Sequence, residues 1–238
     1  MALLKWNQKL TPLDNEIQQL KQEVIAMWEM VVAQLQKAQS ALVHMDSDLA
    51  REVILTEKRV NAFELKIDRD CEDILALFAP VAIDLRFILA VLKINMNLER
   101  TGDIAEGIAK FVVEMAPGLD PRLLEITRAT EMFQQGHEMV ADVMHAFEAE
   151  DTMLARKVFK KDDLLDEINK NAAGIVGTFI RENPEKTEAA LYVLSAIRKL
   201  ERVGDQAKNM AEEIIFYSEA KVLKHKSKNK KSNPDTEQ

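Results

Sequence analysis

The sequence predicts an all-α protein made of two tandem antiparallel three-helix bundles. Three observations support this fold class. The 238-residue chain has only 7 Gly and 6 Pro, so few residues interrupt helices. Apolar residues recur at spacings of three, four and seven, which is the period of an amphipathic helix. The two halves also repeat one another, and a hydrophobic content of 47% is enough for a sizeable core.

The first half of the chain predicts three helices in order. An apolar stripe indicates a helix from Asp14 to about residue 44. Asp46 is a suitable N-cap for a second helix, which reaches about residue 78. Pro80 opens a third helix, which ends before Pro117. The stripe of the first helix consists of Ile17, Leu20, Val24, Met27, Trp28, Val31, Leu35 and Leu42.

The second half predicts three further helices, over residues 121–147, 152–181 and 184–223. Helices of about thirty residues joined by very short turns must fold back antiparallel to one another. We therefore expect one bundle over residues 1–117 and a second over 118–223. Residues 224–238 form a polar, lysine-rich tail without apolar periodicity, which we expect to be disordered.

A tandem duplication links the two halves. When Val91–Ala109 is aligned with Val193–Ala211, 102 residues later, nine of nineteen positions are identical. Upstream, Met45–Val53 resembles Glu150–Val158 at a separation of 105. The change in separation indicates that three residues are missing from the second copy between these stretches, so each element of one half has a counterpart in the other.

The charge distribution excludes some classes of function. The net charge is −8, and residues 221–238 carry six lysines and two acidic residues, so the rest of the chain carries −12. Such an acidic body disfavours nucleic acid and suits cations or a basic surface on a partner protein. The sequence has no apolar run long enough for a membrane span and no signal peptide. With Cys71 as the lone cysteine, it predicts a cytoplasmic protein without direct membrane insertion.

The hexapeptide L-E-R-x-G-D occurs once in each half and predicts a close helix contact. Its glycine costs a helix about 1 kcal/mol relative to alanine. Gly102 lies on a stripe of mostly small residues with Leu98, Ala105 and Ala109, and the second copy repeats this stripe. Small side chains let a neighbouring helix approach closely.

Acidic residues at a spacing of four predict a cation site in each bundle. The carboxylates of each L-E-R-x-G-D motif lie one helical turn apart, and the preceding helix of each copy carries a matching pair. Four oxygen donors on two adjacent helices suit a hard cation such as Mg, Mn, Ca or ferric iron rather than structural zinc. The predicted ligands are Glu57, Asn61, Glu99, Asp103, Asp162, Asp166, Glu201 and Asp205.

Other interpretations of the acidic pairs remain open. They could form a solvated acidic face, or Arg100 and Arg202 could neutralise them by ion pairs. The protein would then be a helical adaptor without metal. A carboxylate-bridged di-metal redox protein is disfavoured because such bundles use Glu-x-x-His twice, and this chain has no such motif. The chain also lacks a glycine-rich phosphate loop, which argues against nucleotide hydrolysis.

Several motifs together resemble the PhoU family of phosphate-uptake regulators. They are P-V-A-x-D-L-R at Pro80–Arg86, L-K-I at Leu92–Ile94, and L-E-R-x-G-D at Leu98–Asp103 and again from Leu200. The resemblance covers about residues 10–225 and implies a pair of three-helix bundles. It also implies a non-enzymatic regulator of phosphate homeostasis, often a homodimer. Such a regulator links a phosphate ABC transporter to a membrane sensor kinase and represses phosphate-starvation genes when phosphate is plentiful.

The resemblance further implies metal binding through E(D)-x-x-x-D motifs, some of which hold multinuclear clusters in this family. The matching positions are the eight ligands named above. The ion would be divalent or trivalent, with iron first and Mn, Mg, Ca or Zn as alternatives. The chain departs from the family pattern at Asn61, which replaces an acidic residue, and at Gly107, where the second copy has Asn209. These departures make the first site the weaker candidate.

Overall fold

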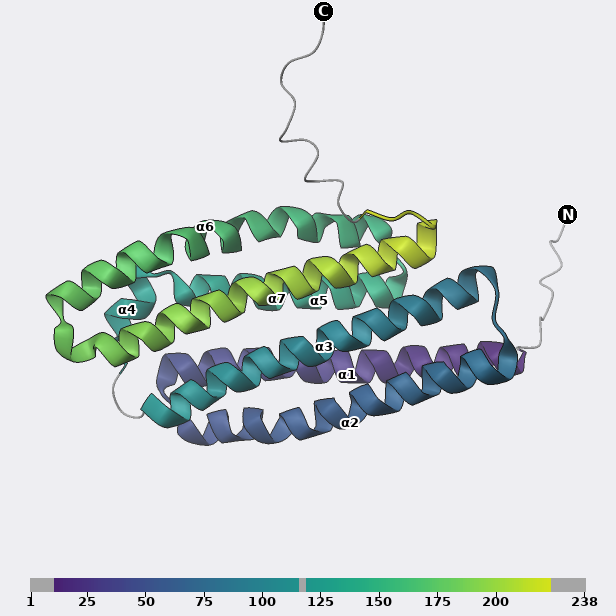
Figure 1. Ribbon diagram of the computed structural model, residues 1–238, viewed down its shortest axis with the longest axis horizontal. Coiled ribbons are helices and arrows are strands. Elements are labelled where there is room, and N and C mark those ends of the chain that lie inside the picture. Colours follow the sequence, from purple (N-terminus) through teal and green to yellow (C-terminus); the bar gives the residue numbers. More distant parts are fainter. Residues whose placement is uncertain (1–10, 116–118, 224–238) are drawn as a thin grey trace, which may run out of the picture.

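The computed structural model describes residues 11–115 and 119–223, in which every regular element is helical. The first bundle consists of α1 (Pro12–His44), α2 (Ser47–Phe78) and α3 (Ala82–Met115). The second consists of α4 (Pro121–Ile126), α5 (Ala129–Ala149), α6 (Thr152–Glu182), a short 3₁₀ helix η1 (Pro184–Lys186) and α7 (Thr187–Glu219). The predicted all-α fold with two antiparallel bundles is confirmed (Figure 1). The predicted boundary at residues 117 and 118 and the predicted tail over 224–238 lie outside the described residues.

Side-chain caps fix where the long helices begin. Thr11 and Asp14 form a capping box, in which the Thr11 hydroxyl accepts from the Asp14 amide at 3.1 Å and the Asp14 carboxylate accepts from the Thr11 amide at 2.7 Å. Asp46 accepts two amide hydrogen bonds at the start of α2, and Asp151 does so at the start of α6. The duplicated caps place α2 and α6 in equivalent positions.

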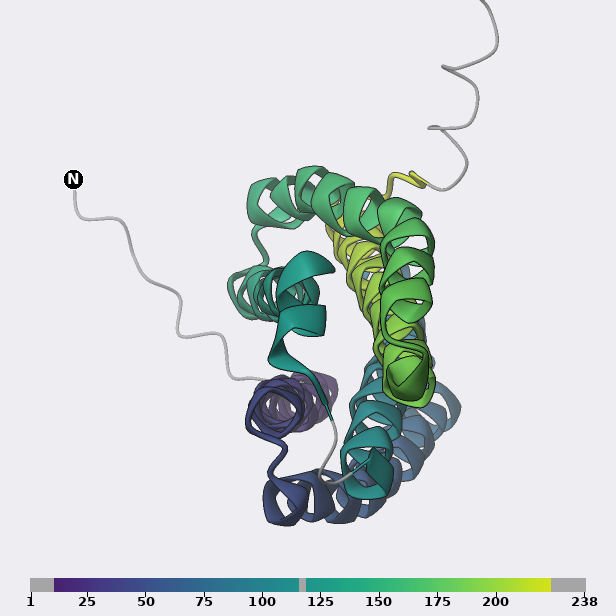
Figure 2. The same cartoon turned by 90° about the vertical axis from the view of Figure 1, so that its left-hand side faces the viewer.

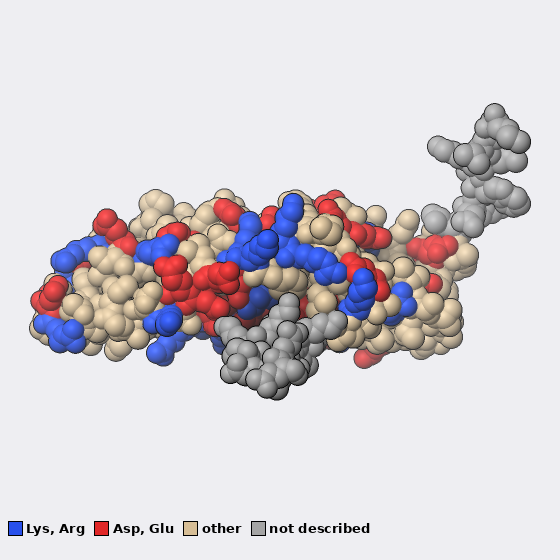
Figure 3. All heavy atoms as spheres, turned by 90° about the horizontal axis from the view of Figure 1, so that it is seen from above, with Lys and Arg blue, Asp and Glu red and all other residues tan. Residues whose placement is uncertain are grey.

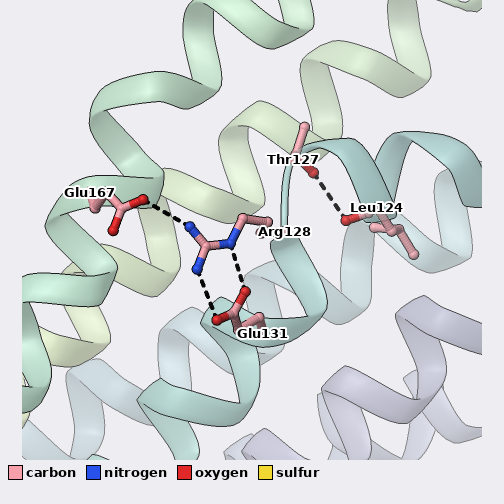
Figure 4. Close-up of polar contacts among 5 residues, drawn as sticks. All are labelled: Leu124, Thr127, Arg128, Glu131 and Glu167. Carbon is pink, nitrogen blue, oxygen red and sulfur yellow. Dashed lines mark hydrogen bonds and ion pairs between the residues drawn. The ribbon is translucent and has the colours of Figure 1, made fainter.

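The helix predicted over 121–147 is wrong in one respect, because the chain breaks between α4 and α5. Arg128 has a φ of 56° and starts α5 in the left-handed region. The Thr127 hydroxyl donates to carbonyl oxygens of α4, including that of Leu124 at 3.4 Å. The Arg128 guanidinium donates to Glu131 at 2.7 and 2.9 Å and to Glu167 of α6 at 2.9 Å (Figure 4). These contacts stabilise the break without Gly or Pro.

Two other predicted helix ends also differ from the structure. The third helix begins at Ala82 instead of Pro80, since Ala79 and Ala82 have φ values of 47° and 50° and the chain turns between them. The last helix begins at Thr187, after η1, and ends at Glu219 instead of residue 223. Ala220, with a φ of 55°, is its left-handed C-cap.

The two bundles lie side by side and share one hydrophobic core. Helix α3 packs along α7, and α1 packs along α5 (Figure 2). Trp28 of α1 is fully buried, and its indole Nε1 donates to the Val140 carbonyl of α5 at 3.1 Å. Its ring lies 5.7 Å from that of Phe147, which in turn contacts Phe87 of α3 and Tyr217 of α7. This aromatic group joins both bundles.

Among residues 11–115 and 119–223, no helix carries an apolar stretch of the length that a bilayer requires.

Candidate functional site: two carboxylate clusters

The glycines of both motifs lie in close contact with side chains of the neighbouring helix. A Cβ atom at Gly102 would lie 2.6 Å from Oε2 of Glu57 on α2. A Cβ at Gly204 would lie 2.7 Å from Leu165 and 2.9 Å from Oδ1 of Asp162, both on α6. The small-residue stripes are buried, which confirms the predicted close approach. Each glycine therefore leaves room for a buried acid of the neighbouring helix.

The first carboxylate cluster consists of Glu57 and Glu64 on α2 and Glu99, Asp103 and Glu106 on α3. Glu57 is only 3% exposed. Its Oε2 accepts a hydrogen bond from Nε2 of Gln34 on α1 at 2.8 Å, while Oε1 is buried and has no hydrogen-bond partner among the described residues.

Burial raises the pKa of Glu57 to about 7, against the hydrogen bond from Gln34, and the negative charges of its neighbours in the cluster act in the same direction as burial. The pKa of Glu99 is also raised to about 7, by burial and then by the charge of Asp103. Burial and the charge of Asp68 raise the pKa of Glu64. These carboxyls repel one another, and a bound cation would relieve the repulsion.

The second carboxylate cluster consists of Asp162 and Asp166 on α6 and Glu201 and Asp205 on α7. Asp162 is 7% exposed, and its Oδ1 is buried without a hydrogen-bond partner in the described structure. Lys208 of α7 forms an ion pair with Oδ2 of Asp162 and another with Oδ1 of Asp205 at 2.8 Å. The second cluster thus contains a cation of its own.

The pKa values in the second cluster reflect this lysine. Burial raises the pKa of Asp162, although the hydrogen bond from Lys208 opposes the rise. Burial and the charges of Asp205 and Asp166 raise the pKa of Glu201. Burial alone would lower the pKa of Lys208, but its hydrogen bonds to Asp162 and Asp205 outweigh burial and raise it. Acidic and basic side chains also lie side by side on the face over α6 (Figure 3).

Seven of the eight predicted ligands lie in these two clusters. The exception is Asn61, which is exposed on α2 and whose side chain makes no hydrogen bond within the described residues. The proposed neutralisation by arginine is not what the structure contains. In the described parts of the chain, Lys208 forms the ion pairs, whereas Arg100 acts on Glu99 only as a more distant charge and Arg202 forms no ion pair.

Sequence reasoning missed Gln34, Glu64, Glu106 and Lys208. Glu106 and Lys208 could have been found, because each follows the aspartate of its motif by three residues and shares its helix face. Gln34 is a polar residue that follows Val31 by three on the apolar stripe of α1. The first cluster has Glu106 where the second has Lys208, so the two clusters differ in charge at this matched position.

The carboxylate oxygens of both clusters are suitable ligands for a hard cation, but their present positions do not form a complete metal site. Within residues 11–115 and 119–223, no three His, Cys, Asp or Glu side chains are grouped closely enough to hold a metal ion as they stand. The feature that suits a cation is one buried carboxylate oxygen without a hydrogen-bond partner in each cluster, on Glu57 in the first and on Asp162 in the second. The predicted ligand set therefore stays a prediction, and binding would require the more exposed carboxylates to rotate toward these oxygens.

Comparisons with known proteins agree with the motifs. The profile of the PhoU domain matches residues 24–112 and 129–214. The "Phosphate-specific transport system accessory protein PhoU homolog" of Aquifex aeolicus is 35% identical over 213 residues, covering 90% of this chain and 96% of the relative. The accessory protein PhoU of Escherichia coli K12 is 30% identical over 211 residues, covering 88% and 86%.

Solved structures show the same fold. The crystal structure of PhoU from Pseudomonas aeruginosa superposes with a TM-score of 0.83 at 32% identity, covering 87% of this chain and 99% of the other. The phosphate transport system regulatory protein PhoU from Streptococcus pneumoniae superposes with a TM-score of 0.77 at 25% identity, covering 89% and 99%. The chain therefore belongs to the PhoU family, as its repeated L-E-R-x-G-D motifs predict.

Proposed function

We propose that this protein is a regulatory accessory component of phosphate uptake. The observation that carries the proposal is the near-complete match to proteins named as accessories of phosphate-specific transport systems, which extends over 96% and 86% of the two relatives above. Both copies of the motif take part in this match, so it covers the two bundles and not a single shared helix pair.

The role that we propose is that of a cytoplasmic, non-enzymatic adaptor. It joins a phosphate ABC transporter to a membrane sensor kinase and represses phosphate-starvation genes when phosphate is abundant, with the protein acting as a homodimer. The long exposed faces of α2 and α6 offer extended surfaces for protein contacts. The −12 charge of residues 1–220 suits a basic partner surface.

We further propose that the carboxylate clusters bind a divalent or trivalent cation, with iron as the first candidate. The buried Oε1 of Glu57 supports this, because an unpartnered carboxylate oxygen is costly unless a ligand satisfies it. A bound cation would neutralise the repelling carboxylates and connect two helices of one bundle. Glu57, Glu99 and Asp103 would hold it in the first bundle, and binding would stabilise the folded state.

Gene deletion tests the regulatory role. Without this protein, phosphate-starvation genes should be expressed in phosphate-rich medium, and a plasmid-borne copy should restore repression. Expression that is the same with and without the gene, in both rich and starved cells, would reject the proposal. Affinity capture from cells grown with ample phosphate should recover subunits of the phosphate ABC transporter, and recovery of none of them would reject the adaptor role.

A metal-free adaptor remains a second candidate, and Lys208 is the observation that favours it. Because this lysine already pairs with Asp162 and Asp205, at least part of the acidic surface is neutralised without metal. Elemental analysis of the purified protein before and after chelation separates the two candidates. Stoichiometric metal that chelation removes supports cation binding, whereas its absence from protein purified without chelator supports the metal-free adaptor.

A further inference from the structure

The two carboxylate clusters differ at one register-matched position on the motif helix. Glu106 on α3 and Lys208 on α7 are 102 residues apart, the same separation as Glu99 and Glu201. The duplication has therefore placed an acid at this position in one bundle and a base in the other. In a cluster of carboxylates, this exchange alters the local charge by two units.

The residues that support the buried acids also differ between the bundles. Close to Gly102, Oε1 of Gln34 lies 3.3 Å from where a Cβ would be, and Gln34 also donates to Glu57. Close to Gly204, the corresponding neighbour is the methyl group of Met139 at 3.7 Å, which offers Asp162 no hydrogen bond. A neutral amide from α1 thus supports Glu57, whereas the ammonium group of Lys208 supports Asp162.

Lys208 makes the connection that a bound cation would make. Its Nζ contacts Asp162 on α6 and Asp205 on α7, so one positive charge joins the two helices close to Gly204. The lysine side chain is 26% exposed and the Asp162 side chain 9% exposed, which keeps this ion pair partly out of water. A metal ion that used the same oxygens would lie directly beside the ammonium group and be repelled by it.

Among the described residues, the first cluster has no equivalent built-in cation. Among the ion pairs of the described residues, Glu106 pairs with Lys110 at 2.6 Å, and Lys110 lies one turn away with a side chain 51% exposed. No described ion pair involves Glu57, Glu99 or Asp103. Glu57 also keeps its buried, unpartnered Oε1 beside these acids. The first cluster is therefore more acidic than the second and lacks an internal occupant.

We propose that Lys208 is the resident cation of the second cluster, where it holds α6 against α7 and keeps hard metal ions out, so that metal binds at the first cluster alone. This inference rests on the proposed cation binding and specifies which bundle performs it. It assigns the two halves of the duplication different roles. The first bundle binds the cation, and in the second an internal ion pair occupies the matching acids.

A calorimetric titration of the full chain with Mn²⁺ as the only added metal tests the inference. Lys208→Met removes the internal cation, and Lys208→Gln removes the charge but keeps a hydrogen-bond donor in case the first variant folds poorly. We expect either variant to bind at least one further Mn²⁺ per chain compared with the wild type. The gain should disappear when Asp162→Asn is added. Lys170→Met, on the exposed surface of α6, is the matched control and should titrate like the wild type.

The reciprocal exchange tests the first cluster. Glu106→Lys places an ammonium group at the position that matches Lys208 and should weaken the Mn²⁺ binding of the wild type at least tenfold. If the Lys208 variants bind no more Mn²⁺ than the wild type while Glu57→Gln abolishes wild-type binding, the assignment of Lys208 is overturned and cation binding stands. If neither the wild type nor any variant binds Mn²⁺, both the inference and the proposed cation site are overturned.

Discussion

Replacing Glu57 with glutamine removes one buried negative charge from the first carboxylate cluster and leaves its size almost unchanged. The glutamine side chain can still accept the hydrogen bond that Gln34 donates at 2.8 Å. The variant therefore isolates the effect of charge at a position that is 3% exposed. We expect it to make the metal-free protein more stable and to eliminate cation binding at the same time.

The size and sign of the effect follow from the pKa of Glu57, which burial raises from 4.5 to about 7. Between these two pH values the folded protein binds more protons than the unfolded chain, so the free energy of unfolding falls as pH rises through this window. Above about pH 7 the full cost of burying the ionised Glu57 is present, and for a shift of this size it lowers the free energy of unfolding by at most about 3–4 kcal/mol. At pH 8, Glu57→Gln should therefore raise the free energy of unfolding by about 1–3 kcal/mol.

Urea denaturation in the presence of chelator, at pH 4.5 and pH 8, measures this difference. The variant and the wild type should be nearly equal at pH 4.5, where Glu57 is protonated in the folded state. Glu72→Gln, an exposed position on the same helix, is the matched control and should change stability by less than about 0.5 kcal/mol. A Glu57→Gln protein that is less stable than the wild type at pH 8 would refute the reasoning.

Two further substitutions test the packing that positions the clusters. Gly204→Ala should lower the free energy of unfolding by about 1–3 kcal/mol, because the added methyl group would lie 2.7 Å from Leu165. Gly177→Ala, which has no neighbour within 4 Å, should raise the free energy of unfolding by up to about 1 kcal/mol. If the melting temperatures of the two variants shift in the same direction, the close packing inferred at Gly204 is contradicted. Trp28→Phe should cost about 1–3 kcal/mol in urea denaturation, since the hydrogen bond to the Val140 carbonyl between the bundles is lost, and an unchanged midpoint would show that this contact does not hold them together.

Much of the fold could be predicted from the sequence because its signals are local and occur twice. The predicted cap at Asp46 begins α2 in the structure, and Asp151, its counterpart in the repeat, begins α6. The stripe from Leu20 to Leu42 is buried as its spacing predicts. Duplication made these signals more reliable, because each expectation in one half could be checked against the other.

The break at Arg128 could not be predicted in the same way. A non-glycine residue with a positive φ is disfavoured by its own backbone, so nothing at this position indicates an interruption. The break is stabilised by ion pairs to Glu131 and to Glu167, and the latter lies on another helix. The contact with Glu167 joins residues that are distant in the sequence, which local patterns do not predict.

The candidate site was predictable in outline and incomplete in detail. Pairs of acids at a spacing of four identified six members of the two clusters, and the register match between the repeats added Glu57. Lys208 decides the charge of the second cluster but was not predicted, because only Arg100 and Arg202 were expected as neutralising cations. Gln34 lies on a third helix, and its contact with Glu57 depends on how the bundle closes. Local spacing cannot specify such a contact.

The most direct test of the cation sites is anomalous X-ray diffraction from crystals of the wild-type protein grown with Mn²⁺. We expect an anomalous peak between α2 and α3, within coordination distance of Glu57, Glu99 and Asp103. We expect no peak between α6 and α7, where Lys208 should remain paired with Asp162. A peak between α6 and α7, with or without one at the first cluster, would contradict the exclusion of metal by Lys208, and a peak at neither cluster would contradict the assignment of a metal-binding first bundle.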